Sequence, residues 1–585
     1  MGNNKPTRLV LWTILIILST VILRWPVSYG YHYQAVQALS AIDHVFIFGI
    51  IYTAWIILLL ILARKGNFGS NAVLVSIFGF VHGGFFIINA PYITAASFDP
   101  SGVSYVNYIM THSKFILGDP QWAYFEFPAN AVLGALVTHI TGLSIFVASK
   151  VILTAGCVLL PLAGYSFYYR FVGKSFLSLL GVILAMLGSI YLIALGQFRP
   201  GTLGLILLAP FLVLVSIEGP NMSKSRAKVF LLLLVFATVI LTHFISSATL
   251  IFLILGIFTY QRIIKKEIIS FNIIILILTL GIVWWLYESL YVTKYVADRY
   301  LAFMSEPSSL SFVLAFRKAQ TLVGGEVPIW ASLVRIFWTL FIFVLPCLMA
   351  LIVFLSLKKR KVEIEIGMLM GLTAMTILMF VADQGGDRSI PNFFQFGTFI
   401  LPLILLRTFA SNDLNISMKI PVKVTKYVEM ASLAFVVAIA FPTFIAHNPS
   451  VNTQIMYDRE YATFRFIQTR IASSNSINLF CDADTLTIYN YFIPEAKINV
   501  FPYAPDIVKN KPEFIAELPL YIGTFNKSDD YSIFIYSPRI SHRSFIQLNV
   551  SELDPIWDNV KSALASNDRI YTNGFDSIDV NLPRL

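Results

Sequence analysis

The sequence is short of charged residues. Asp, Glu, Lys and Arg together make up 13% of its 585 residues, whereas hydrophobic residues make up 57%. A water-soluble protein of this length cannot bury so much apolar surface in its own core, so the composition excludes an ordinary soluble protein. The bilayer must act as solvent for most of the chain, and we expect a polytopic α-helical membrane protein.

Cysteine is scarce as well. The three cysteines, Cys157, Cys347 and Cys481, lie far apart in the sequence, so neither a disulfide framework nor a cysteine-rich zinc site is expected. The net charge of +10 does not indicate nucleic-acid binding, because Lys and Arg occur in short clusters between apolar runs. Such clusters set the topology of membrane proteins. We therefore expect membrane lipids, and no nucleic acid, among the partners.

Apolar runs fill the first 450 or so residues, and each is roughly long enough to cross a bilayer. We expect about thirteen transmembrane helices, near residues 8–24, 44–63, 71–92, 144–166, 176–196, 202–217, 229–246, 247–261, 272–290, 333–356, 365–382, 391–406 and 428–446. If these spans alternate, seven basic clusters fall on one face, which marks that face as cytoplasmic. The expected topology in the cell membrane has a cytoplasmic N-terminus and an extracytoplasmic C-terminus.

The composition turns polar after His447, which indicates a second domain. Strand-like stretches at Ile477–Cys481 and Tyr531–Tyr536 lie between helix-like stretches at 459–472 and 557–565. We expect a transmembrane domain over residues 1–447 and an extracytoplasmic α/β domain over residues 448–585.

The long external loop between residues 89 and 144 is the main candidate for chemistry. It holds three carboxylates, Asp99, Asp119 and Glu126, close to several aromatic residues. A carboxylate at a membrane surface can act as general base for an attacking hydroxyl, or it can hold a divalent cation such as Mg²⁺ or Mn²⁺ that neutralises a phosphate leaving group. The sequence does not specify the ligands of such a metal. An interfacial loop with solvated acids is the alternative interpretation.

Aromatic residues and a histidine in this loop are candidates for binding a substrate. A helix beginning after Asp99 would place Tyr105, Tyr108 and His112 on one face, at positions i, i+3 and i+7. That stripe, together with Tyr124, could stack on sugar rings or simply anchor the loop at the membrane interface. The apolar segment 127–142 is short, and we expect it to form an interfacial or re-entrant helix beside the site.

Basic residues near the external surface are candidates for binding a phosphate. Arg199 lies in the turn Gln-Phe-Arg-Pro-Gly, and Arg388 lies in a glycine-bearing turn beside Asp387. His243 follows a Leu-Thr dipeptide where a span meets the external surface. The alternatives are a lipid-headgroup anchor for Arg199, a structural ion pair for Arg388 and an interhelical hydrogen bond for His243.

These motifs together resemble the GT-C superfamily of membrane glycosyltransferases, particularly prokaryotic members that use polyprenyl-phosphate-linked sugars. The resemblance rests on the Asp after an early span, the aromatic-Pro segment 124–128, the run Phe-Arg-Pro-Gly-Thr-Leu-Gly at 198–204 and Leu-Thr-His at 241–243. It extends over about residues 71–410. It implies a catalytic transmembrane domain that performs an inverting transfer of a hexosyl or pentosyl group at the extracytoplasmic face, with lipid phosphate as the leaving group and a glycan, lipid or protein as the acceptor.

The resemblance also implies roles for individual residues. The catalytic Asp of the family's first external loop is best matched by Asp99, with Asp119 or Glu126 as possible second acids. The residues expected to contact the donor or the acceptor are Tyr105, His112, Tyr124, Arg199, His243 and Arg388. Two departures from the family pattern are that the loop follows a third span, and that Asp99-Pro100 lacks the paired acids of protein mannosyltransferases.

Two other classes of protein fit part of the pattern. The catalytic subunit of an oligosaccharyltransferase would also have about thirteen spans and an external C-terminal domain, but its Trp-Trp-Asp-x-Gly signature is absent, and Trp284-Trp285-Leu286 ends a span instead. A non-enzymatic transporter or a protein that only binds lipid-linked glycans is the second alternative. A transporter is disfavoured because the spans from 144 to 290 are almost uncharged between their ends.

Overall fold

The structure is a computed structural model, and it describes part of the chain. The described residues are 5–24, 35–89, 99–114, 127–187, 198, 200–218, 226–265, 269–289, 293–294, 297–298, 301, 350–351, 353–354, 364–382, 477–480, 531–536, 568–572 and 577–581. Most of them are helical, as the composition predicted.

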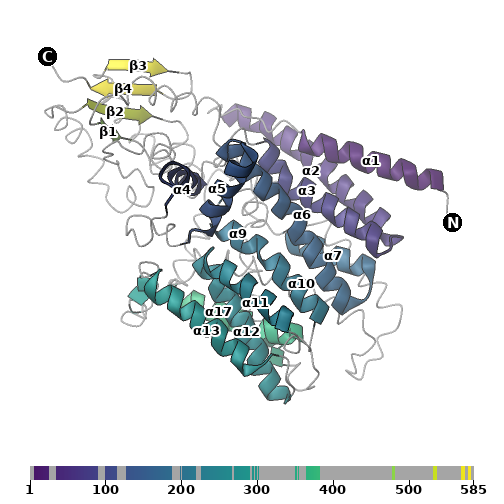
Figure 1. Cartoon of the computed structure of the whole chain (residues 1–585). Coiled ribbons are helices and arrows are strands. Elements are labelled where there is room, and N and C mark those ends of the chain that lie inside the picture. The colour runs from purple at the N-terminus through teal and green to yellow at the C-terminus, as the bar shows by residue number, and fades with distance from the viewer. Residues whose placement is uncertain are drawn as a thin grey trace.

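The larger helices lie against one another and form most of the described molecule (Figure 1). They are α1 (Lys5–Leu23), α2 (Ala35–Arg64), α3 (Phe68–Asn89), α4 (Asp99–His112), α5 (Ala129–Thr141), α6 (Ile145–Val172), α7 (Ser175–Met186), α9 (Pro200–Ile206), α10 (Leu208–Glu218), α11 (Arg226–Ile240), α12 (Phe244–Ile264), α13 (Phe271–Tyr287) and α17 (Ile364–Ala382).

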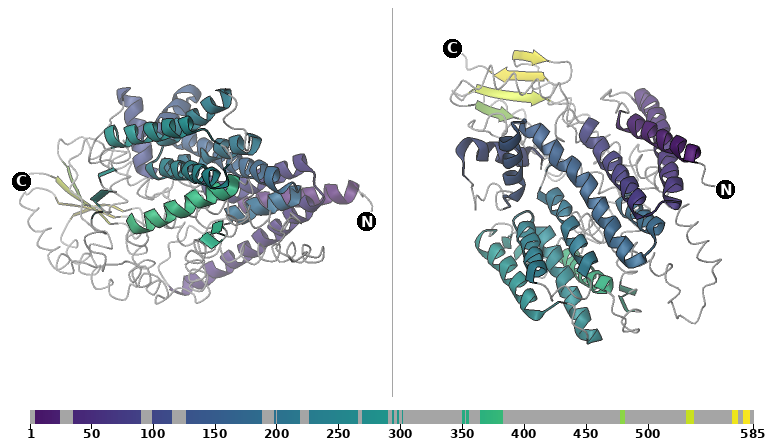
Figure 2. Two further views of the ribbon diagram at one scale, coloured as in Figure 1. Left: turned by 90° about the horizontal axis from the view of Figure 1, so that it is seen from below. Right: turned by 45° about the vertical axis from the view of Figure 1, so that its right-hand side comes forward.

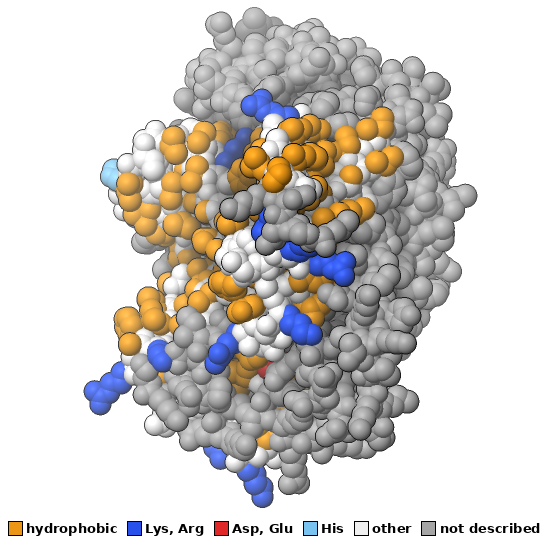
Figure 3. Space-filling view, turned by 90° about the vertical axis from the view of Figure 1, so that its right-hand side faces the viewer, with side chains coloured by type: hydrophobic (Ala, Val, Ile, Leu, Met, Phe, Trp, Pro, Cys, Tyr) orange, Lys and Arg blue, Asp and Glu red, His pale blue; other side chains and the backbone are white. Residues whose placement is uncertain are grey.

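Several helices have the length and composition of membrane spans. Among the described residues, five are long and apolar enough to cross a bilayer, at Pro6–Leu23, Ile47–Arg64, Phe68–Phe85, Ile145–Val172 and Phe244–Ile264. Large apolar side chains, including those of Ile61, Leu159 and Phe230, are exposed on these and neighbouring helices. Figure 3 shows how much of one face is apolar, with Lys and Arg side chains between the apolar areas. Lipid is the solvent that suits such a surface.

The expected spans correspond to helices wherever the structure describes them in full, with two differences. The run expected over 229–246 covers parts of two helices, because residues 241–243 form a turn between α11 and α12. The run 202–217 is divided at Leu207 into α9 and α10. Pro210 lies in the first turn of α10, where its missing N–H and its ring prevent a normal bond to the carbonyl four residues earlier. The expected spans 391–406 and 428–446 lie outside the described residues, as does most of 333–356, so the count of thirteen stays a prediction.

Small residues allow close contact between two of the apolar helices. Gly256 of α12 lies against Gly367 and Gly371 of α17, and a Cβ atom at Gly256 would overlap backbone atoms of both. Transmembrane helices associate through such contacts, because lipid provides no hydrophobic force to bring them together. We infer that these glycines hold α12 and α17 at a short distance.

The C-terminal residues form a four-stranded sheet with the order β1-β2-β4-β3. The strands are β1 (Ile477–Phe480), β2 (Tyr531–Tyr536), β3 (Asp568–Thr572) and β4 (Ser577–Asn581). β1 and β2 are parallel and match the two strand-like stretches of the sequence, while β4 runs antiparallel to β2 and β3. In Figures 1 and 2 the sheet lies near α4 and α5, and the N-terminus lies at the other end of the helices. The expected helices 459–472 and 557–565 lie outside the described residues.

Candidate functional site

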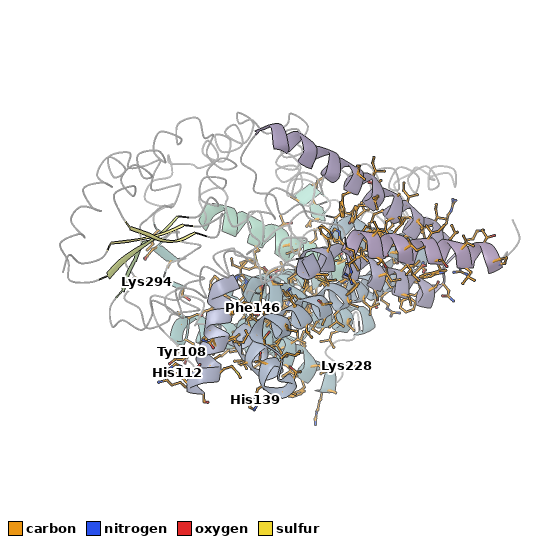
Figure 4. All side chains as sticks on the ribbon, turned by 90° about the horizontal axis from the view of Figure 1, so that it is seen from above. Tyr108, His112, His139, Phe146, Lys228 and Lys294 are labelled. Atoms are coloured by element: carbon orange, nitrogen blue, oxygen red, sulfur yellow. The ribbon has the colours of Figure 1, made fainter. Side chains whose placement is uncertain are left out.

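Helix α4 begins at Asp99 and carries the expected aromatic stripe. Tyr105 is buried in the hydrophobic core, Tyr108 is half-buried and His112 is exposed. The rings of Tyr108 and His112 stack with centroids 4.2 Å apart, and Nδ1–H of His112 donates to the carbonyl oxygen of Tyr108 over 3.1 Å (Figure 4). The stripe therefore runs from the core to the surface, with its imidazole end open to the surroundings.

Helix α5 begins against the turn that precedes α12. The backbone N–H of Ala129 donates to the carbonyl oxygen of Leu241 over 3.1 Å. The Phe127 ring lies edge-on to the imidazole of His243, with centroids 6.5 Å apart. The short apolar helix expected over 127–142 is thus present, and it ends at Gly142 in the left-handed region (φ 68°). The start of α5 therefore contacts the Leu-Thr-His motif at residues 241–243.

His243 has a structural role at the start of α12. Its Nδ1 accepts a hydrogen bond from the backbone N–H of Ser246 over 3.4 Å and lies 3.0 Å from the Ser246 hydroxyl oxygen, so it is the N-cap of the helix. In the neutral imidazole this leaves the proton on Nε2. The ring also lies against α9, because a Cβ atom at Gly201 would be 3.5 Å from its Cε1 and 3.7 Å from its Nε2.

A third contact joins α4 and α5 to the Phe-Arg-Pro-Gly motif. A Cβ atom at Gly134 of α5 would lie 2.7 Å from Cγ2 of Val106 in α4 and 3.1 Å from Cζ of Phe198. Phe198 and Val106 are both fully buried. Glycine at residue 134 therefore lets Val106 and Phe198 pack closely on this face of α5, and a larger residue would force one of these side chains to shift.

These contacts bring together four segments that are distant in sequence. They are α4, residues 127–134, the pair Phe198 and Gly201, and residues 241–243, and we call their meeting point the α4–α5–α9–α12 junction. Of the sequence-predicted site residues, Tyr105, His112 and His243 are described with their side chains, and Asp99 is described as the first residue of α4. The remaining candidates lie outside the described residues: Asp119, Tyr124, Glu126, Arg199 and Arg388.

Two kinds of information about the junction were not available from the sequence. Phe127 and Phe198 were recognised as parts of motifs, but only the structure shows that Phe127 lies against His243 and that Phe198 lies against Gly134 of α5. Asn130, in the first turn of α5, was not singled out, and it is buried at this junction with 3% of its surface exposed. For a metal, the described part of the chain has no group of three or more His, Cys, Asp or Glu residues that could hold an ion.

Two proteins of known structure are similar to this chain over most of its length. ArnT from Cupriavidus metallidurans in the apo state matches at 12% identity and a TM-score of 0.46, over 91% of this chain and 98% of that one. The same protein bound to undecaprenyl phosphate matches at 10% identity and a TM-score of 0.41 over the same shares. The Archaeoglobus fulgidus oligosaccharyltransferase tethered with an acceptor peptide matches at 12% identity and a TM-score of 0.48, over 83% of this chain and 72% of that one.

The similarity concerns the arrangement of the chain. The undecaprenyl phosphate and the acceptor peptide are ligands of those two proteins. No family model and no curated protein matches the sequence.

Proposed function

We propose that this protein is a GT-C-type membrane glycosyltransferase that moves a sugar from a polyprenyl-phosphate-linked donor to an acceptor at the extracytoplasmic face. The observation that supports this proposal most directly is the α4–α5–α9–α12 junction. The motifs that resemble the superfamily are spread over residues 99–243, and a structural role for each motif alone would not require them to meet. A shared substrate would require it.

The chemistry assigns opposite tasks to two parts of the site. The acceptor oxygen attacks the anomeric carbon of the sugar, and the carboxylate of Asp99 takes the proton that this oxygen loses. The bond between the anomeric carbon and the lipid phosphate oxygen breaks, and its electron pair leaves with the phosphate. Positive charge stabilises the departing phosphate, and Arg199 and Arg388 are proposed for that task.

The described contacts support a site that includes both parts. Asp99 begins α4, and α4 packs on α5 through Val106 and Gly134. Phe198 packs on the same glycine, and Arg199 is the next residue in the chain. The proposed base and one proposed phosphate-binding residue are therefore each attached to an element of the same junction.

The experiment that tests the proposal is a transfer assay on the purified full-length protein in lipid nanodiscs. Polyprenyl-phosphate donors with radiolabelled sugars are supplied together with membrane extract as a source of acceptors. We expect labelled product and free polyprenyl phosphate to form together. A protein that binds these donors but releases no polyprenyl phosphate from any of them would contradict transfer, and would favour a protein that only binds lipid-linked glycans.

The same assay tests Asp99 as the base. Asp99→Asn removes the base and keeps the shape, so we expect transfer to fall about 10²-fold or more, with donor affinity nearly unchanged. Thr111→Ala, an exposed change on the same helix, is the matched control and should leave transfer intact. If Asp99 serves only the first turn of α4, its replacement lowers stability by about 0.3–1 kcal/mol and leaves turnover intact.

A further inference from the structure

Asn130 carries a buried hydrogen-bond donor that has no partner among the described residues. Its side chain is 3% exposed, and its Nδ2 makes no hydrogen bond there. Around the turn that α5 contacts, the Thr242 hydroxyl donates to the carbonyl of Thr238 over 2.6 Å and the Ser246 hydroxyl bonds to His243. Further along α5 the Thr138 hydroxyl, like the Asn130 amide, has no partner among the described residues. A buried amide without a partner destabilises the fold, and an apolar residue in the first turn of α5 would avoid that cost.

The position of Asn130 places this donor at the junction. Residues four apart lie on the same face of a helix, so Asn130 shares a face with Gly134, one turn nearer the start of α5. That face contacts Val106 of α4 and Phe198. The bond from Ala129 to Leu241 holds the start of α5 against the turn before α12. The amide is therefore held in place at the meeting point of the four segments.

We propose that Asn130 binds the ligand, and that its Nδ2–H donates a hydrogen bond to a phosphate oxygen of a polyprenyl-phosphate donor bound at the α4–α5–α9–α12 junction. This inference rests on the proposed function and adds a residue to it. An NH₂ group only donates, so its partner must be an acceptor, and a phosphate oxygen is an acceptor without a hydrogen of its own. A neutral amide donates such a bond without carrying a charge of its own.

Two substitutions of Asn130 separate ligand binding from folding. Asn130→Leu keeps a similar volume and removes the unpartnered donor, so the protein should fold at least as stably as the wild type. Asn130→Asp keeps the shape but brings a negative charge toward the phosphate. Thr138→Val is the matched control, because the Thr138 hydroxyl is also buried without a partner among the described residues, and it lies on the same helix two turns further on.

The measurement is equilibrium binding to the full-length protein in nanodiscs with three probes: polyprenyl phosphate, the corresponding polyprenol without phosphate, and inorganic phosphate. We expect Asn130→Leu to weaken binding of polyprenyl phosphate about 10-fold or more, and Asn130→Asp to weaken it further. Binding of polyprenol should not change in either variant, and Thr138→Val should bind all three probes as the wild type does.

Three results would overturn the inference. They are wild-type affinity of Asn130→Leu for polyprenyl phosphate, an equal loss of affinity for polyprenol, and inorganic phosphate that binds as tightly as the lipid. The outcome is separable from that of the proposed function. If Asn130→Leu weakens binding of polyprenyl phosphate but the wild-type protein transfers no sugar, the inference is supported and the proposed function is contradicted. If the wild-type protein transfers sugar and Asn130→Leu binds polyprenyl phosphate with unchanged affinity, the function is supported and the inference is contradicted.

Discussion

His82 of α3 caps the end of α7, because its Nε2–H donates to the carbonyl oxygen of Met186 over 2.9 Å. Met186 is the last residue of α7, and its carbonyl has no successor within the helix to bond. The Nδ1 of His82 accepts from the hydroxyl of Tyr52 in α2. One fully buried imidazole therefore joins three helices, and both of its nitrogen atoms have partners.

Replacing this imidazole should destabilise the protein. In His82→Leu the Met186 carbonyl and the Tyr52 hydroxyl lose their hydrogen bonds to the imidazole, and we expect the free energy of unfolding to fall by about 1–3 kcal/mol. Unfolding of the purified protein in detergent by heat or by added SDS measures this. Adding Tyr52→Phe should recover part of the loss, since it removes one of the two polar groups that bonded to the imidazole. A His82→Leu protein as stable as the wild type would contradict the role of His82 as a cap.

Substitutions of His243 should separate its structural task from contact with a substrate. His243→Ala removes the cap of α12 and should cost about 1 kcal/mol of stability, whereas His243→Asn can cap the helix and should keep most of it. If the imidazole also contacts the donor, His243→Asn stays stable but transfers sugar more slowly. Melting temperature and transfer rate are measured on the same preparations. If His243→Asn is stable and transfers sugar at the wild-type rate, His243 caps α12 and does not contact the substrate.

The contact between α12 and α17 should be sensitive to a single methyl group. A Cβ atom at Gly371 would overlap the carbonyl of Phe252, and backbone cannot yield as a flexible side chain does. Gly371→Ala should therefore lower stability by about 1–3 kcal/mol. Ala374→Val adds volume to an exposed residue of the same helix and serves as the control. Equal stability of the two variants would mean that the helices separate at little cost.

The expected topology can be tested at two exposed residues. In a background with Cys347→Ser and Cys481→Ser, Thr111→Cys on α4 should react with a membrane-impermeant maleimide in intact cells, and Lys174→Cys between α6 and α7 should react only after permeabilisation. Cys157 is buried and should not interfere. Labelling of Lys174→Cys in intact cells would reverse the orientation and place the junction in the cytoplasm.

Local sequence patterns predicted most of the described helices, because a segment in lipid must satisfy its backbone hydrogen bonds within itself. The apolar runs near 8–24 and 144–166 became α1 and α6 for that reason, and the short run 127–142 became the short helix α5. The break at Leu207 was missed, since hydropathy does not register the effect of Pro210 on the helix. In the polar region, strand-forming residues predicted β1 and β2.

The sequence by itself determined that this chain has apolar helices suited to a membrane, and it pointed to four motifs with the residue types of a transferase. Only the tertiary structure decided which motifs meet. The contacts of Gly134 with Val106 and Phe198, and the bond from Ala129 to Leu241, join residues that no local pattern relates. In a membrane protein such contacts depend on small residues and single hydrogen bonds between helices, because hydrophobicity drives each helix into lipid but does not select its neighbours.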